Sequence, residues 1–269
     1  YALLNILPRD IADAHISGSI HINNLGEWIL KPSIIAHDVR CFFEKGLKHG
    51  LGPFKVFRGT PKNLQSALSL LLEVLQFSSR EVLNEQVLDY FNVFLAPFIG
   101  GMNQDDVIDA LSNFIIEVNH LIPEKVSLGI ELSPPKFVME KEAVGPNGRV
   151  VGVYEDYHDE SLLFASALLE AMLRLGEKPF FNPNVIIKVR KETVKNGDSS
   201  DLLFKAHDLS SKTGTPYFAN LTYSNQSQVL YSSSGFRLAP NWSGDWELDT
   251  LRTGCIDSVI LNLPRAYYD

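Results

Sequence analysis

Thiols are the side chains in this sequence best suited to redox or nucleophilic chemistry, and there are two of them, Cys41 and Cys255. Two cysteines in a chain of 269 residues make neither a disulfide framework nor a four-cysteine zinc site. Their small number fits a reducing compartment, so we expect a cytoplasmic protein. Both thiols are expected to be small, buried and unreactive unless their surroundings favour chemistry.

Two pairs of polar residues have the types needed for metal binding or proton transfer. His15 and His21 flank Gly18, but their six-residue spacing is not a standard ligand spacing. We expect hydrogen bonds near a turn from these histidines, and no metal site. His37 could be oriented by the carboxylate of Asp38, yet adjacent side chains diverge on a helix. Asp38 is therefore predicted to cap a helix.

Other local patterns indicate turns and solvated side chains. The glycines at residues 100–101 and 145–148 match neither the dinucleotide-binding pattern nor the P-loop pattern, so turns are expected there. No Ser, His and Asp set has the sequence signature of a catalytic triad. Glu140 and Glu142 lie in polar surroundings and are expected to face solvent. Local patterns alone therefore reveal no active site.

The composition of the chain limits which classes of molecule it is expected to bind. The chain is 45% hydrophobic with a net charge of −8, which argues against a general nucleic-acid binder. A nucleotide site stays open, because a few backbone N–H groups and one or two cations suffice for it. The longest apolar helical stretch, residues 64–77, is too short to cross a membrane. The chain begins inside an apparent helix and ends after a strand, so we expect a fragment, folded as a single domain over residues 1–269.

The spacing of apolar residues predicts an α/β protein with a substantially parallel sheet. Helices are predicted at residues 8–15, 38–50, 61–77, 105–120, 160–176 and 199–213. Strands are predicted at residues 126–132, 184–189 and 217–221, with short candidates at 19–23 and 33–39. Residues 89–97 fit a buried strand or a helix, and residues 136–156 fit a hairpin or an exposed excursion.

The end of the chain contains a polar loop, residues 232–238, and then an apolar run, residues 258–265. We predict a buried strand for the run and a loop that presents its tip to the interior of a barrel. Several separated segments resemble the catalytic barrel of anaerobic (class III) ribonucleoside-triphosphate reductases, the glycyl-radical ribonucleotide reductases. In family order, these segments are residues 15–26, 36–47, 89–102, 178–184, 214–220, 237–238 and 253–265.

This resemblance implies the first half or more of a ten-stranded α/β barrel, built from two parallel five-stranded halves and decorated with long helices. The family reduces ribonucleoside triphosphates to 2′-deoxyribonucleoside triphosphates. A glycyl radical, generated by a radical-SAM activase, oxidises a finger-loop cysteine to a thiyl that abstracts the 3′ hydrogen, and a second cysteine on the first barrel strand helps to reduce the 2′ carbon. ATP and deoxynucleotides are the family's effectors. No cofactor, ATP-cone or glycyl-radical segment is expected in this chain.

Residues at key family positions differ here. Phe236 stands at the finger-loop cysteine and Ile34 at the first-strand cysteine. Asn23 and Asn24 replace the second His and the Asp of the family's His-x-His-Asp segment. Cys255 starts the strand after the loop and is a possible substitute thiol. The resemblance therefore implies a family member whose thiol chemistry is altered.

Two functions follow from this comparison. We expect a reductase homologue that is impaired in catalysis and retained for nucleotide binding or for association with a homodimeric or reductase partner. The alternative is an active anaerobic reductase that depends on Cys255 or on residues outside the chain, since Cys41 is expected to face elsewhere. Helices at residues 61–77 and 105–120 are candidates for a dimer interface, unless their apolar stripes simply pack on the barrel. The candidate substrate-binding residues are His21, Asn23, Ser234, Gly235, Arg237 and Asn262.

Overall fold

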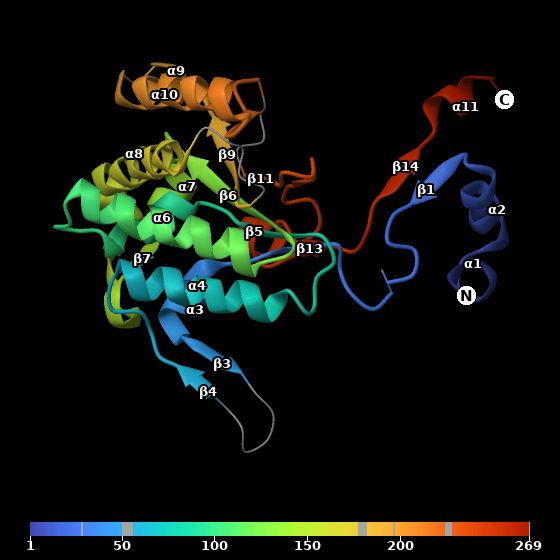
Figure 1. Ribbon diagram of the computed structural model, residues 1–269, viewed down its shortest axis with the longest axis horizontal. Coiled ribbons are helices and arrows are strands. Elements are labelled where there is room, and N and C mark those ends of the chain that lie inside the picture. Colours follow the sequence, from blue (N-terminus) through green and yellow to red (C-terminus); the bar gives the residue numbers. More distant parts are fainter. Residues whose placement is uncertain (28, 50–55, 177–181, 196, 224–227, 269) are drawn as a thin grey trace.

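The computed structural model describes the chain except for residues 28, 50–55, 177–181, 196, 224–227 and 269, and it is built on a six-stranded sheet (Figure 1). The strand order is β10-β9-β6-β5-β2-β13, in which the first five strands are parallel and β13 is antiparallel to β2. The bounds are β2 Ile34–Ala36, β5 Glu85–Leu88, β6 Lys125–Glu131, β9 Asn184–Val189, β10 Tyr217–Asn220 and β13 Gly254–Cys255. The predicted α/β fold with a mainly parallel sheet is confirmed.

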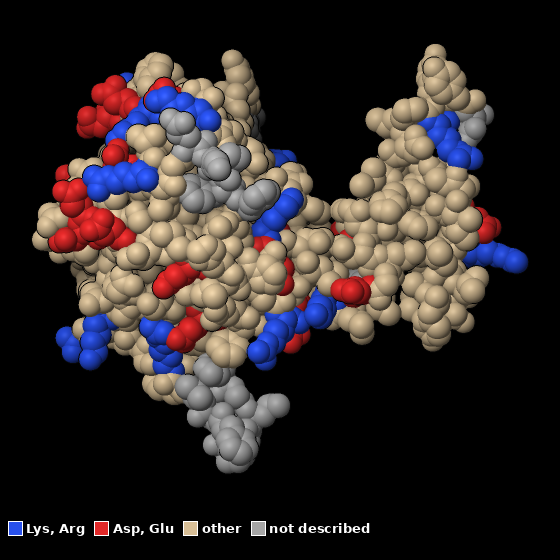
Figure 2. All heavy atoms as spheres, in the orientation of Figure 1, with Lys and Arg blue, Asp and Glu red and all other residues tan. Residues whose placement is uncertain are grey.

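A small lobe lies apart from the sheet and joins the two ends of the chain (Figure 1). Its centre is an antiparallel pair, β1 (Ile20–Ile22) with β14 (Val259–Leu261). The helices around this pair are α1 Ala2–Asn5, α2 Arg9–Ser17 and α11 Leu263–Tyr268. Figure 2 shows that the lobe meets the main body across a narrow waist and presents few charged side chains in this view.

Four long helices cover one face of the sheet (Figure 1). They are α4 Leu64–Ser78, α6 Gln104–Leu121, α8 His158–Leu175 and α10 Gly197–Thr213, and each connects two neighbouring parallel strands. Because the strand order advances in one direction and such crossovers are right-handed, the helices all fall on the same face. The opposite face is thereby left open to loops from elsewhere in the chain.

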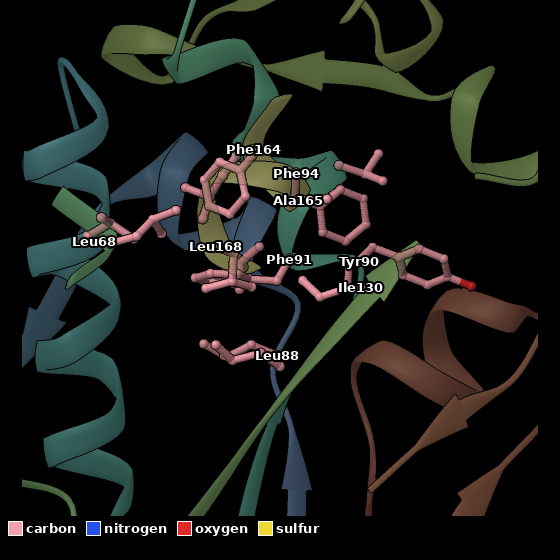
Figure 3. Packing of buried hydrophobic residues seen from close by; sticks show 14 of the residues in the cluster. Leu68, Leu88, Tyr90, Phe91, Phe94, Ile130, Phe164, Ala165 and Leu168 are labelled. Atoms are coloured by element: carbon pink, nitrogen blue, oxygen red, sulfur yellow. The ribbon is translucent and has the colours of Figure 1, made fainter. Parts of the chain in front are cut away.

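The core lies between these helices and the sheet (Figure 3). Phe91 stacks on Phe114 with ring centroids 5.7 Å apart and meets the edge of Phe164 at 5.6 Å. Offset and edge-to-face pairs of this kind add about 0.5–1.5 kcal/mol to the burial of the rings. Phe91 begins the short helix α5 (Phe91–Leu95), so the ambiguous segment 89–97 is helical, and the 3-10 turn Ala96–Phe98 follows it.

The apolar stripes of α4 and α6 belong to this core. Leu68 and Leu75 of α4 and Leu111 and Val118 of α6 are at most 2% exposed. Asn63 caps α4 by accepting a hydrogen bond from the backbone N–H of Ser66 at 2.9 Å. The apolar stripes of α4 and α6 therefore pack on the sheet, which was the expected alternative to a dimer interface.

Smaller elements complete the described chain. They are α3 Val39–Lys45, the hairpin of β3 Leu47–His49 and β4 Val56–Arg58, α7 Lys136–Met139, the hairpin of β7 Glu142–Val144 and β8 Val150–Val153, α9 Lys191–Lys195, and the hairpin of β11 Leu230–Tyr231 and β12 Arg237–Leu238. Single-turn helices lie at Pro146–Gly148, Tyr154–Tyr157 and Glu247–Leu251. The hairpin predicted within residues 136–156 is confirmed. No helix in the described ranges is long and apolar enough to span a membrane.

Two sequence predictions were wrong in part. The helix predicted at residues 38–50 ends at Gly46, whose positive φ of 69° turns the chain into β3. Gly50, the predicted stop, lies outside the described residues. The apolar run at residues 258–265 contains the predicted strand, β14, and then the start of α11. The strand is not buried as predicted, because Val259 and Leu261 are 57% and 63% exposed. Apolar composition predicts a strand here, whereas burial depends on a neighbour that only tertiary structure can supply.

Candidate functional site

A cavity of about 590 Å³ opens at the amino-terminal ends of β2, β5 and β6, beside the small lobe. Asn84 and Lys125 line it from the sheet, and Lys125 is its cation. The remaining lining residues are Asn23, Asn24, Ser33, Ile34, Ser234, Gly235, Phe236, Ser258 and Ile260. Amide and hydroxyl groups with one cation suit a ligand that has hydroxyls and an anionic group.

The small lobe supplies one wall through paired side chains. Asn23 donates hydrogen bonds to Ser258, one from its side chain to the hydroxyl and one from its backbone N–H to the carbonyl at 3.1 Å. The side chain of Asn24 donates to the carboxylate of Asp257 at 3.2 Å. Because these contacts join residues more than 230 positions apart, both ends of the chain are needed to build this wall.

The loop between β11 and β12 supplies the opposite wall. Within it, the Gly235 N–H donates to the Ser232 carbonyl at 3.1 Å, and the Ser232 N–H donates to the Phe236 carbonyl at 3.0 Å. Gly235 has a φ of +87°, a conformation that favours glycine and lets the chain reverse within five residues. Ser234, Gly235 and Phe236 all reach the cavity. We call residues 232–236 the tip loop.

An apolar cluster lies under the tip loop, on the face of the sheet opposite the long helices. It consists of Ile34, Ala36, Val87 and Leu230, with Phe236, Leu238 and Cys255 packed against it. Cys255 is the register partner of Ile34 across the antiparallel pair of β13 and β2, so both side chains point to the same side of the sheet. The Cys255 thiol donates to the Asp257 carbonyl at 3.2 Å, and burial raises the pKa of this thiol, which therefore stays protonated at neutral pH.

A buried carboxylate anchors the tip loop to the sheet. Glu85, the first residue of β5, accepts hydrogen bonds from the hydroxyls of Ser127 at 2.5 Å and Ser233 at 2.9 Å. It also accepts the backbone N–H groups of Ser233 at 2.8 Å and Ser234 at 3.2 Å. Ser127 in turn accepts the Ser233 N–H at 3.0 Å. Several donors on one carboxylate offset the cost of burying its charge.

A second cluster of charged side chains lies at the carboxyl ends of β5, β6 and β9. Lys188 is 2.6 Å from Asp89 and 3.4 Å from Glu131, and Arg190 binds both oxygens of Glu131 at 2.7 and 2.8 Å. The Lys188 ammonium also lies 3.9 Å from the centre of the Tyr90 ring. Burial raises the pKa of Asp89, although Lys188 opposes that rise. Two cations thus balance two carboxylates inside the sheet.

A third ionic network joins α3 to the segment before β13. Asp38 caps α3 by accepting the Arg40 N–H at 3.2 Å, as predicted, and its carboxylate also binds the side chains of Arg40 and Arg252. Burial opposes the charge of Asp38, but the hydrogen bonds from both arginines lower its pKa below the usual value. Cys41 lines a separate cavity with Arg40 and Glu247, so its predicted direction, away from Ile34, agrees with the structure.

The structure brings together some of the predicted site residues. Asn23, Ser234 and Gly235 line the cavity, and Ile34, Phe236 and Cys255 share the apolar cluster beside it. The other three candidates, His21, Arg237 and Asn262, do not line this cavity.

Each of the three has another place. His21 is exposed and stacks on His15 at 5.3 Å, while His15 accepts the Ile22 N–H at 3.1 Å. Asn262 donates to the Gly18 carbonyl and accepts the Arg265 N–H, which fastens α11. Arg237 is an exposed residue of β12. Among the described residues, no group of three or more His, Cys, Asp or Glu side chains is arranged for a metal.

Sequence reasoning missed Glu85 and the rest of β5. The stretch from Glu85 to Asp89 has acidic residues at both ends and Gln86 beside Val87 and Leu88 between them, so it has no simple alternation of apolar and polar residues. Acidic residues at alternate positions of a strand, such as Glu85 and Asp89, do share one face. The even spacing of Glu85 and Asp89 could have indicated that they share a face, but only if the segment had first been predicted to be a strand.

Together these features define an α/β protein in which a hairpin loop and a small lobe enclose a ligand-sized cavity at one end of a parallel sheet. The family model of anaerobic ribonucleoside-triphosphate reductase matches residues 1–269, and the chain belongs to that family. No curated protein sequence matches the chain.

Solved structures of similar fold include those of anaerobic ribonucleotide reductase from Thermotoga maritima. The structure in complex with dATP and CTP is 15% identical with a TM-score of 0.70, over 98% of this chain and 45% of that one. The structure with dATP bound in the specificity site is 15% identical with a TM-score of 0.67, over 95% and 44%. The chain therefore spans less than half the length of these relatives. Of the segments that carry the family resemblance, residues 178–181 lie outside the described part.

Proposed function

We propose that the chain forms one half of a reductase-type barrel that binds nucleotides but lacks thiol chemistry at the two family cysteine positions. The five parallel strands in chain order, from β2 to β10, match the expected composition of such a half. The second half would come from the rest of a longer protein. The finer architecture, a ten-stranded barrel, is part of this proposal.

The observation that carries the proposal is the apolar cluster under the tip loop. Phe236 and Ile34, at the positions of the two family cysteines, pack into the same cluster. Neither side chain has an S–H group, so neither can relay a hydrogen atom between a glycyl radical and a ribose. The loop tip therefore does not fit the radical relay of the family.

The cavity beside the cluster supports nucleotide binding. Its amide and hydroxyl groups suit a ribose, and Lys125 suits a phosphate at the entrance. The Thermotoga maritima reductase has been solved with dATP and CTP. We extend nucleotide binding to this chain, with either a homodimer or a reductase subunit as its protein partner.

Calorimetry on the full-length protein tests this proposal, using dATP, dGTP, dTTP and the four ribonucleoside triphosphates. We expect binding of at least one nucleotide and no reductase turnover under anaerobic conditions. Lys125→Met should raise the Kd of a triphosphate bound in this cavity about tenfold, by loss of one charged hydrogen bond. The control is Lys62→Met, because Lys62 is exposed and does not line this cavity. Absence of binding by every nucleotide would contradict the proposal.

The position of Cys255 favours a second candidate function, an active anaerobic reductase. Its register pairing with Ile34 places a thiol one strand away from the first-strand cysteine position, on the same side of the sheet. In that case the full-length protein should show reductase turnover once its glycyl radical is formed by a radical-SAM activase. Cys255→Ala should then abolish turnover, whereas Cys41→Ala, in its separate cavity, should leave it unchanged. Turnover that survives Cys255→Ala would exclude this role for Cys255.

A further inference from the structure

Glu85 differs from the other buried carboxylates on the open face of the sheet in what it binds. Asp89 and Glu131 pair with Lys188 and Arg190, so their partners are cations at the carboxyl end of β9. The hydrogen bonds to Glu85 come instead from Ser127 on β6 and from Ser233 and Ser234 in the tip loop. Glu85 is itself fully buried.

Three of those four hydrogen bonds come from the tip loop. Two are from consecutive backbone N–H groups, those of Ser233 and Ser234, and they reach different oxygens of the carboxylate. Hydrogen bonds to an ionised acceptor are shorter and roughly twice as strong as those between neutral groups. The carboxylate is therefore the group on the sheet to which the loop backbone is fastened.

The hairpin that carries the tip loop has little support of its own. Each of its strands, β11 and β12, has two residues, with Leu230 opposite Leu238 and Tyr231 opposite Arg237. An isolated two-stranded hairpin is marginally stable in water. Contacts with the sheet must fix the loop, and these include the apolar packing of Leu230, Phe236 and Leu238 and the hydrogen bonds to Glu85.

We propose that Glu85 is a positioning residue, which holds the tip loop against the sheet so that the loop wall of the cavity is formed before any ligand binds. Ser127 supports Glu85 by donating to one carboxylate oxygen while accepting the Ser233 N–H. Ser234, Gly235 and Phe236 follow directly in the chain, so the anchor sets where they meet the cavity. Pre-formed loops avoid the entropy cost of ordering on binding.

Amide hydrogen exchange on the full-length protein without nucleotide tests the anchor directly. Glu85→Gln keeps the shape of the side chain but replaces one acceptor oxygen with an NH₂ group that faces loop donors. We expect exchange of the Ser233 and Ser234 amides to rise about tenfold, with β6 and α4 unchanged. Glu81→Gln is the matched control, because Glu81 is an exposed residue just before the same strand. Glu85→Asp, which keeps the charge at shorter reach, should restore part of the protection.

Ser233→Ala gives an independent test should Glu85→Gln not fold. It removes one donor to Glu85 from a partly exposed loop residue and should raise exchange of the same two amides by a smaller factor. Unchanged exchange of these amides in the folded variants, or a rise spread equally over β6 and α4, would overturn the proposal.

A second measurement rests on the proposed function. If CTP binds the wild type, Glu85→Gln should raise its Kd, because the loop must then be ordered during binding. If no nucleotide binds the wild type, the proposed function is contradicted, but the exchange experiment still decides the role of Glu85. An exchange effect without any change in the Kd of a bound nucleotide would overturn the link between the anchor and the cavity.

Discussion

At the scale of single residues, the open face of the sheet carries charged side chains at buried positions, which are usually occupied by apolar residues. Glu85, Asp89, Glu131 and Lys188 are each at most 1% exposed. Alternation along β5, β6 and β9 places these groups opposite the residues that face the long helices. Gly129 fits the same design, since a Cβ at that position would overlap the carboxylate of Asp89.

Removal of Lys188 should be costly and dependent on pH. Lys188→Met would leave Asp89 as a buried charge without its cation, at a cost of about 3–5 kcal/mol in the free energy of unfolding near neutral pH. Burial already raises the pKa of Asp89, and loss of Lys188 should raise it further. An acid whose pKa is higher in the folded state favours folding below its unfolded pKa, and this advantage is lost as pH rises through the folded value. Urea denaturation should therefore show a larger deficit at pH 8 than at pH 5.

Lys212→Met is the control for that experiment, because Lys212 is half exposed and pairs with Asp208 one helical turn away. It should leave the urea midpoint nearly unchanged. A deficit for Lys188→Met that is equal at both pH values would show that Asp89 does not carry the effect.

At the scale of elements, three ionic or hydrogen-bonded anchors join segments of the chain that lie far apart in the sequence. Glu85 holds the tip loop, and the Asn23 and Asn24 pairs hold the small lobe to the segment before β14. Asp38 joins the start of α3 to Arg252, which lies two residues before β13. Each anchor links segments distant in sequence, so each is expected to form with the tertiary structure.

Asp38→Asn separates the role of charge from the role of the helix cap. Asparagine is also a good N-cap, so α3 should persist, but Arg40 and Arg252 would lose their shared anion. Since Arg40 is largely buried, we expect a loss of about 2–4 kcal/mol in the free energy of unfolding at pH 7. The pKa of Asp38 is lowered on folding, so its contribution is present above the unfolded pKa and is lost as pH falls through the folded one.

Chemical denaturation from pH 7 toward pH 3 should thus bring the Asp38→Asn variant and the wild type together. Asp105→Asn serves for comparison, because Asp105 pairs with Arg174 on the protein surface and should matter little at any pH. A gap between the Asp38→Asn variant and the wild type that stays constant in acid would show that the carboxylate charge is not the cause.

At the scale of the whole molecule, the main body buries its helix-facing core well, whereas the small lobe does not cover its apolar residues. Tyr1, Leu4, Leu261, Tyr267 and Tyr268 are all more than 60% exposed. Charged side chains are sparse on the lobe in Figure 2. Large contiguous apolar patches on soluble proteins mark contacts with further protein surface or a tendency to aggregate.

Residues 1–269 expressed alone should therefore self-associate. We expect concentration-dependent sedimentation and light scattering for this fragment, and less of both when Val259 and Leu261 are changed to Lys, because charges on an exposed strand oppose edge pairing. Lys substitution of exposed Val150, on the separate β7–β8 hairpin, is the control. A fragment that is monomeric at all concentrations would contradict this prediction.

The sequence by itself determined the class of fold, the positions of the long helices and the family. Helical and strand periodicities are local properties of the sequence. Short motifs such as Asn262 to Arg265 can likewise be recognised without knowledge of where the fold places them. The sequence also singled out Ile34 and Phe236, which the family resemblance alone assigns to the two cysteine positions. It did not determine that they would pack together with Cys255 in one cluster.

Only the tertiary structure decided which polar residues share a site. The contacts of Glu85 with Ser233, and of Asp89 with Lys188, join positions 148 and 99 residues apart, and no local periodicity encodes such pairings. Burial of β14 was predicted from its composition and was wrong, because the exposure of a strand depends on what covers it. Local propensity acts within a few residues, whereas the cavity, its anchors and its apolar cluster arise from strand order and register.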